Sequence, residues 1–133
     1  MESNPAATFS TDIELRFSDL DAYGHVNNAV FFTYLETART KLFLDKFIDF
    51  LNGGLLFLVV KAECEYRKPI QISDRVVVSM TAPRIGRSSF DIDYTIHNGQ
   101  GSTFATAKTV MVCYDGKRGQ AVAIPEDLKT HLA

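Results

Sequence analysis

Apolar and polar residues alternate with a period of two along several stretches of this chain, and that alternation limits the possible folds more than any other feature. In the stretch 56–66, every second residue is apolar, aromatic or small, and charged residues alternate with them from Lys61 onward. In the stretch 90–96, Phe90, Ile92, Tyr94 and Ile96 share one face. This period is typical of β-strands that bury one face and expose the other. The sequence therefore predicts a sheet with one covered face.

Three further strands are predicted at 9–17, 75–82 and 102–114, where apolar residues again alternate or cluster. The strand that begins near Leu56 is expected to end at Pro69. Between the strands 90–96 and 102–114, Asn98-Gly99 predicts a hairpin with a type I′ turn, in which both residues have positive φ. Pro125 favours a short helix near the end of the chain.

The stretch 27–52 has the spacing of a helix instead. Asn27 and Asn28 are good caps for its start, and Gly53 and Gly54 suit its end. Apolar residues recur at intervals of three and four, at Phe31, Tyr34, Leu35, Ala38 and Leu42. Others lie around the rest of the circumference, at Val30, Phe32, Phe43 and Phe47. One long, largely buried helix is therefore expected.

A buried helix between the first and second of five strands predicts an α+β fold, in which an antiparallel sheet curls around a central helix. The length of 133 residues suits one domain, spanning 1–133. The strands at the edges of such a sheet have unpaired backbone groups, and apolar residues are expected to be exposed there. Pairing with another subunit, at least as a dimer, is therefore predicted.

Composition excludes several classes of protein. The net charge of −2 gives no reason to expect nucleic acid or an anionic membrane as a partner. No apolar run reaches the length of a membrane span, and residues 1–8 lack the pattern of a secretory signal, so a cytoplasmic protein is expected. Cys64 and Cys113 lie far apart without a metal-binding spacing, which predicts two reduced thiols and no zinc site.

The segment from Asp19 to Asn28 carries the densest chemistry, because its polar residues lie in a loop that leads into the buried helix. A helix start offers free backbone N–H groups and a partial positive charge, which stabilise an oxyanion. Asn28 N–H is the candidate donor. Asp21 is placed to act on water or to attack a carbonyl carbon. A thioester suits such a site, because its leaving thiol, with a pKa of roughly 8.5, departs with little acid assistance.

The stretch from Arg16 to Arg39, RFSDLDAYGHVNNAVFFTYLETAR, resembles the signature of the 4-hydroxybenzoyl-CoA thioesterase family of hotdog-fold proteins. The resemblance implies that Asp21 is catalytic and that the amide of Asn28 binds the thioester oxygen. The GHVNN segment is similar to that of long-chain and general acyl-CoA thioesterases in the family. The expected activity is hydrolysis of an acyl-CoA to a free acid and coenzyme A, without a separate cofactor, by a homodimer or homotetramer.

The same resemblance implies that coenzyme A lies across a subunit interface and that basic residues after the third strand meet its phosphates. Arg84 and Arg87 are the candidates, since arginine suits phosphate, and Gly86 would let the backbone approach the ligand. Ser88 and Ser89 are expected to be turn residues or to contact the ligand. They lack the G-x-S-x-G pattern of a serine nucleophile.

Several alternatives remain open from the residues alone. Asp21 could simply form an Asx turn, as many loop aspartates do. Asp19 is expected to be structural, and Glu36 is a reserve catalytic candidate that could instead pair with Arg39. His25 could orient a water molecule. The alternative functions are hydrolysis of acyl-carrier-protein thioesters, a dehydratase reaction on the same fold, or acyl-CoA binding without catalysis.

Overall fold

Six strands form one curved antiparallel sheet in the computed structural model, which describes residues 9–132 of the chain apart from the side chain of Asp45. The order across the sheet is β1-β3-β4-β5-β2. The strands are β1 (Phe9–Ile13), β2 (Leu55–Tyr66), β3 (Val76–Ile85), β4 (Ser89–His97) and β5 (Thr103–Asp115), and a short β6 (Gln120–Ala121) pairs with β5. Both edges, β1 and β2, are therefore far apart in the sheet although they are consecutive strands along the chain.

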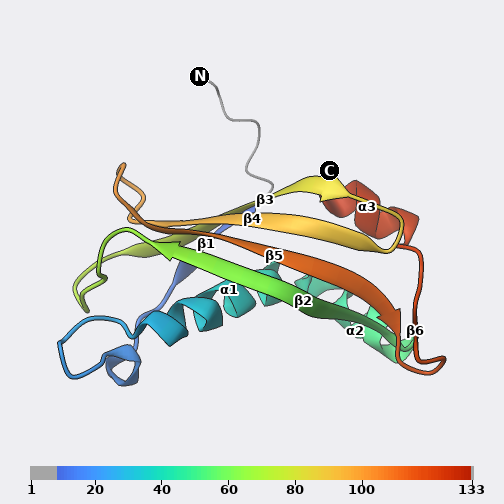
Figure 1. Ribbon diagram of the computed structural model, residues 1–133, viewed down its shortest axis with the longest axis horizontal. Coiled ribbons are helices and arrows are strands. Elements are labelled where there is room, and N and C mark those ends of the chain that lie inside the picture. Colours follow the sequence, from blue (N-terminus) through green and yellow to red (C-terminus); the bar gives the residue numbers. More distant parts are fainter. Residues whose placement is uncertain (1–8, 133) are drawn as a thin grey trace.

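The helices are α1 (Asn28–Leu42), α2 (Leu44–Asn52) and α3 (Glu126–Leu132), and a 3-10 turn η1 (Phe17–Asp19) precedes α1. The sheet curves over α1, as Figure 1 shows. The alternation in β4 has the expected result, because its four inward side chains are each 2% exposed or less. The five apolar residues predicted on one face of α1 are all buried. The predicted α+β fold, with a sheet curled around a helix, is confirmed. None of the helices within residues 9–132 is long and apolar enough to cross a membrane.

The prediction of a single helix over 27–52 is wrong at Phe43, where α1 ends and α2 begins. The carbonyl oxygen of Leu42 lies 2.7 Å from Nε2 of His131 on α3. Lys46 N–H, which a continuous helix would direct to Leu42, donates instead to the carbonyl of Phe43 at 2.9 Å. A contact with the far end of the chain therefore replaces one bond of the helix ladder, and the helix is interrupted there.

The prediction that this helical region is buried on most sides is also wrong. Phe32 is 37% exposed and Phe47 is 41% exposed. The reason is the position of α1, which contacts β1 and β3 and lies on that side of the sheet. β2 is contacted instead by α2, and Leu58 and Val59 in this edge strand are 40% and 42% exposed.

Two local predictions also need correction. The first strand ends at Ile13 rather than Phe17, because the carboxylate of Asp19 accepts a hydrogen bond from Arg16 N–H at 3.1 Å and closes the turn η1, which leaves Phe17 85% exposed. The hairpin at Asn98-Gly99 is wider than a two-residue turn. Asn98 N–H donates to the carbonyl of Ser102 at 3.0 Å, and the positive φ angles belong to Gly99 and Gly101.

Candidate active site

The loop between η1 and α1 forms a tight turn that presents Asp21. Asp21 N–H donates to the carbonyl of His25 at 2.8 Å, and Gly24 N–H donates to the carbonyl of Asp21 at 3.0 Å. Gly24 has φ of 80°, a conformation that glycine adopts without strain. Isolated bridges from Leu20 to Val26 and from His25 to Gln71 hold both sides of the turn. The loop is therefore ordered by its own backbone before any ligand binds.

The Asp21 carboxylate takes part in this turn with one oxygen. Oδ1 accepts a hydrogen bond from Tyr23 N–H at 2.9 Å and a longer one from His25 N–H at 3.5 Å. This is the Asx turn considered as the alternative to catalysis. Oδ2 has no hydrogen-bond partner among the described residues, and Asp21 is only half-buried. The turn therefore orients the carboxylate and leaves one oxygen available to a water or a substrate.

Asp19 has the structural role that the sequence predicted. It is 2% exposed, and its carboxylate accepts hydrogen bonds from Tyr34 Oη at 2.9 Å and from Arg16 N–H at 3.1 Å. Burial pushes its pKa upward, but the hydrogen bonds from Arg16 and Tyr34 outweigh burial and hold the pKa of this carboxyl below its usual value. Its backbone carbonyl accepts from Asn27 N–H at 2.9 Å. Asp19 thus ties the loop to the start and the middle of α1.

The first turn of α1 has one backbone donor that is free. Asn27 is the N-cap, and its side chain accepts from Ala29 N–H at 2.9 Å while its carbonyl accepts from Val30 N–H at 2.9 Å. Within residues 9–132, Asn28 N–H has no acceptor. A free N–H at a helix start, combined with the helix dipole, is a suitable site for a developing negative charge.

Tyr66 is a residue of this region that sequence reasoning treated only as part of a strand. Its hydroxyl donates to the carbonyl oxygen of Asn28 at 2.8 Å, across 38 positions of the sequence. Its ring meets Phe31 of α1 edge to face, with ring centroids 4.9 Å apart. Local periodicity contains no signal for this contact, because it depends on where the end of β2 passes the start of α1.

An apolar groove lies between the helices and β2. Its volume is about 450 Å³, and its walls include Phe43, Phe47 and Leu51 from the helical side and Phe57 and Leu58 from β2. A smaller adjoining hollow of about 290 Å³ shares Glu36, Arg39 and Val59 with it. Volumes of this size are typical of sites for small ligands. A larger hollow of about 570 Å³ lies among charged residues such as Glu63, Asp93 and Lys108, away from the loop that carries Asp21.

The side chain of Arg39 extends from α1 to the sheet, where it contacts β4, instead of pairing with a residue of its own helix. Its Nη1 donates to Tyr94 Oη at 3.2 Å, and Tyr94 Oη lies 2.7 Å from the hydroxyl of Thr109. The Glu36–Arg39 ion pair considered from the sequence does not form among the described residues. Glu36 is exposed at the edge of the groove.

The four residues predicted to meet coenzyme A lie where β3 turns into β4, at the opposite end of the molecule from the loop before α1 (Figure 1). Arg84 donates to the carboxylate of Asp91 at 2.9 Å and to the hydroxyl of Ser89 at 3.0 Å, so its charge is already partnered. Arg87 is exposed, and its carbonyl accepts from Ile124 N–H. The carbonyl of Ser88 accepts from Cys113 N–H. Within one chain, these residues and Asp21 do not come together.

The sequence model of the thioesterase-like superfamily matches residues 15–132. The chain belongs to this superfamily. A 1,4-dihydroxy-2-naphthoyl-CoA hydrolase from Thermosynechococcus vestitus is 30% identical over 97% of this chain and 91% of its own length. The long-chain acyl-CoA thioesterase FadM from Escherichia coli is 30% identical over 92% of this chain and 95% of its own. A thioesterase from Thermus thermophilus, solved with coenzyme A and Zn, is 34% identical, covers 94% of this chain and 92% of its own, and has a TM-score of 0.79.

Membership of the thioesterase-like superfamily confirms the predicted hotdog fold and the prediction of a thioester hydrolase. The resemblance to the 4-hydroxybenzoyl-CoA thioesterase family is confirmed at the level of the superfamily, and the narrower assignment stays a prediction. Among residues 9–132, no group of three His, Cys, Asp or Glu side chains is arranged to bind a metal ion. Burial raises the pKa of the Cys113 thiol to about 11, which makes it a poor nucleophile at neutral pH.

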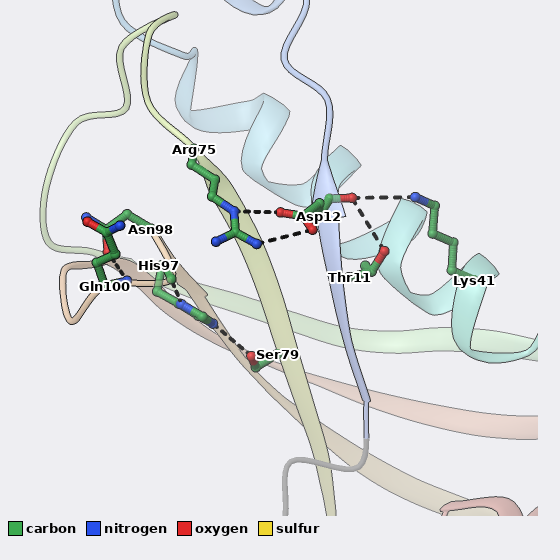
Figure 2. A network of polar contacts seen from close by, with 9 residues as sticks. Thr11, Asp12, Lys41, Arg75, Ser79, His97, Asn98 and Gln100 are labelled. Atoms are coloured by element: carbon green, nitrogen blue, oxygen red, sulfur yellow. Dashed lines mark hydrogen bonds and ion pairs between the residues drawn. The ribbon is translucent and has the colours of Figure 1, made fainter.

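A serine–histidine pair elsewhere on this thioesterase-like chain has the wrong hydrogen bonding for nucleophilic catalysis. Ser79 Oγ and His97 Nε2 lie 2.8 Å apart, near the Asp12–Arg75 ion pair (Figure 2). Gly99 N–H donates to His97 Nδ1 at 3.0 Å, so the neutral ring carries its proton on Nε2 and donates to Ser79. Burial, assisted by Arg75, lowers the pKa of His97 and favours this neutral form. His97 therefore does not accept a proton from Ser79, as a general base must.

Proposed function

We propose that this protein hydrolyses an acyl-CoA to a free carboxylic acid and coenzyme A, with Asp21 as the catalytic carboxylate and Asn28 N–H as the oxyanion donor. The observation that carries the proposal is that one loop and the helix start after it offer both a free carboxylate oxygen, on Asp21, and a free N–H, on Asn28. The chain that carries them belongs to the thioesterase-like superfamily. The names of the two relatives, which both act on CoA thioesters, support the substrate class.

The proposed reaction needs few groups. Asp21 takes a proton from a water molecule as the water oxygen attacks the thioester carbon, and the negative charge that forms on the carbonyl oxygen is held by Asn28 N–H. The tetrahedral intermediate then re-forms the carbonyl and breaks the carbon–sulfur bond. The departing thiolate, whose conjugate thiol has a pKa of roughly 8.5, accepts the proton from Asp21. In the second form of the mechanism Asp21 attacks directly, and water hydrolyses the resulting anhydride.

His25 is assigned a supporting role in this proposal. Its backbone carbonyl accepts from Asp21 N–H and so helps to hold the turn. His25 is half-buried and lies in the same turn as Asp21, and its side chain would orient the attacking water.

The proposed functional unit is a homodimer formed through β2, which two such dimers would extend to a tetramer. β2 is an edge strand with three exposed apolar residues in succession, Leu58, Val59 and Val60. Such an edge is a template for pairing with another chain. A two-fold axis there would set β2 antiparallel to its copy. The start of α1, which adjoins the Tyr66 end of β2, would then face the groove at the Leu55 end of the partner's β2.

This arrangement would bring together features that one chain keeps apart. The acyl group would enter the groove, whose aromatic and aliphatic walls suit an apolar chain or ring. Arg87 at the β3–β4 turn would meet a phosphate, with Ser88 and Ser89 beside it, whereas Arg84 would first have to leave Asp91. Acyl-CoA is thus the expected partner molecule.

The test is release of free thiol from short, long, aromatic and hydroxylated acyl-CoAs by the wild type, Asp21→Asn and Asp49→Asn. Asp49 is exposed on α2, which makes it a matched control for the removal of one charge. We expect Asp21→Asn to lose roughly 100-fold or more of kcat and the control to retain it. Cleavage of carrier-protein thioesters alone, or binding without turnover, would contradict the proposal.

A further inference from the structure

The orientation of one peptide group decides whether the helix start is a useful oxyanion site. Of the first-turn donors of α1, Ala29 N–H and Val30 N–H are bound by Asn27, at 2.9 Å each. Asn28 N–H alone is left for a ligand among the described residues. An oxyanion donor contributes most when its direction is set before the substrate arrives. Whatever holds Asn28 in place therefore affects the rate.

Tyr66 is the side chain that holds Asn28. Its hydroxyl donates to the carbonyl oxygen of the residue whose N–H is the free donor, at 2.8 Å. Its ring is held in turn against Phe31, one helical turn further along α1, with an angle of 77° between the rings. The Asn27 side chain and Tyr66 hold the N–H and the carbonyl of the 28–29 peptide. This group adjoins the 27–28 peptide, which carries the free Asn28 N–H and whose carbonyl accepts from Val30 N–H.

We propose that Tyr66 is a positioning residue, which orients the Asn28 N–H toward the thioester carbonyl through its hydrogen bond to the Asn28 carbonyl. This inference rests on the proposed function, since it needs Asn28 to be the oxyanion donor. Tyr66 is not itself a catalytic residue, because its one O–H is engaged with Asn28. Burial raises the pKa of the Tyr66 hydroxyl, so it stays protonated at neutral pH and remains a donor.

The first experiment compares Tyr66→Phe with the wild type and with Tyr114→Phe, on the acyl-CoA that the wild type cleaves best. Tyr66→Phe keeps the ring against Phe31 and removes only the hydroxyl. Tyr114, on β5, has no side-chain hydrogen bond within the described residues, so it serves as the matched control. We expect kcat to fall about tenfold in Tyr66→Phe with KM within about twofold, and no change in the control. The melting temperature should stay within about 5 °C of the wild type.

The second experiment reads the carbonyl directly and needs no turnover. The probe is a ketone analogue of the acyl-CoA that the wild type binds most tightly, in which CH₂ replaces the thioester sulfur and the carbonyl carbon is ¹³C, so that infrared spectroscopy isolates its stretch. A hydrogen bond from Asn28 N–H lowers the stretching frequency of the bound carbonyl. We expect a higher frequency in Tyr66→Phe than in the wild type and in Tyr114→Phe, because the donor is less well aligned.

The outcomes separate this inference from the proposed function. If the wild type turns over acyl-CoA and Tyr66→Phe matches it in both kcat and carbonyl frequency, the positioning role is overturned while the thioesterase stands. If the wild type cleaves no acyl-CoA, the proposed function falls, and the frequencies still decide whether Tyr66 aligns the donor. A fall in kcat together with a higher carbonyl frequency supports the inference.

Discussion

His131 Nε2 lies 2.7 Å from the carbonyl oxygen of Leu42, so the C-terminal helix α3 closes the end of α1. Leu42 is the last residue of α1 and would otherwise have an unsatisfied carbonyl where the helix breaks. The contact joins positions 89 apart in the sequence. Leu42 lies next to Phe43, where α2 begins, and α2 forms one wall of the apolar groove.

Removing this contact should destabilise the fold. We expect His131→Ala to lower the free energy of unfolding by about 1 to 2 kcal/mol, because a carbonyl loses its partner and a half-buried ring is removed. Urea unfolding measures the change. His131→Gln retains an N–H donor and should recover part of the loss, and equal losses in the two variants would mean that ring packing alone is responsible.

Gly24 should matter for activity as well as stability. Its φ is 80°, and a Cβ there would meet no atom within 4 Å, so Gly24→Ala adds backbone strain without a clash. Gly101, with φ of 94° and equally open surroundings, is the matched control, in a hairpin remote from Asp21. Each variant should lose about 1 kcal/mol of stability by thermal or urea unfolding.

Only Gly24→Ala should also lower kcat, because its turn carries the Asp21 carboxylate. Thiol release by the two variants at a temperature where both are folded makes the comparison. If Gly101→Ala lost as much activity as Gly24→Ala, the loss would reflect general destabilisation and not the presentation of Asp21.

Stability should fall in mild acid because of His97. Burial, together with Arg75, holds the pKa of His97 below its ordinary 6.5. The unfolded chain therefore takes up this proton at a higher pH than the folded one. The contribution of His97 is complete above pH 6.5 and decreases as the pH falls from there through the lowered pKa. The free energy of unfolding, measured with urea at about pH 7.5 and at about pH 5, should change less between the two pH values in His97→Gln than in the wild type.

The groove between the helices and β2 should set the length of acyl chain that is accepted. Val59 lines it, and Val60, its neighbour in the β2 bulge, is 59% exposed and does not. We expect Val59→Phe to lower kcat/KM for the longest acyl-CoAs by about tenfold and to spare the shortest, because the larger ring fills space the chain needs. Val60→Phe adds the same bulk to the β2 edge outside the groove, so a loss that both variants share reports on pairing at that edge. A uniform loss over all chain lengths in Val59→Phe would show that it disturbs assembly instead.

The elements that follow from local periodicity were predictable. Each β-strand and helix face is encoded by residues two, three or four positions apart, so Phe90, Ile92, Tyr94 and Ile96 could be assigned to the core. The same holds for the helix start at Asn27 and Asn28, because capping involves only neighbouring residues. The structural role of Asp19 could also be predicted, because it bonds to its neighbour Arg16, while the catalytic role of Asp21 stays a prediction.

The errors share a physical cause. The helical spacing of a sequence does not indicate that the carbonyl of Leu42 will contact His131 instead of the next turn of the helix. Nor does an apolar side chain such as Phe47 indicate that it will stay 41% exposed. Arg84 and Arg87 lie at the other end of the molecule from Asp21, so their contact with coenzyme A across a subunit interface stays a prediction.

The sequence by itself thus determined the α+β class, the five strands, the start of the helix and the contiguous loop that carries Asp21, because these depend on hydrogen bonds and burial patterns among residues near one another in the chain. Only the tertiary structure decided that Tyr66 holds Asn28, that Arg39 reaches Tyr94, and that a groove lies between the helices and β2. Those features depend on the path of the chain between distant segments, and that path is selected by the packing of the whole core rather than by any local pattern.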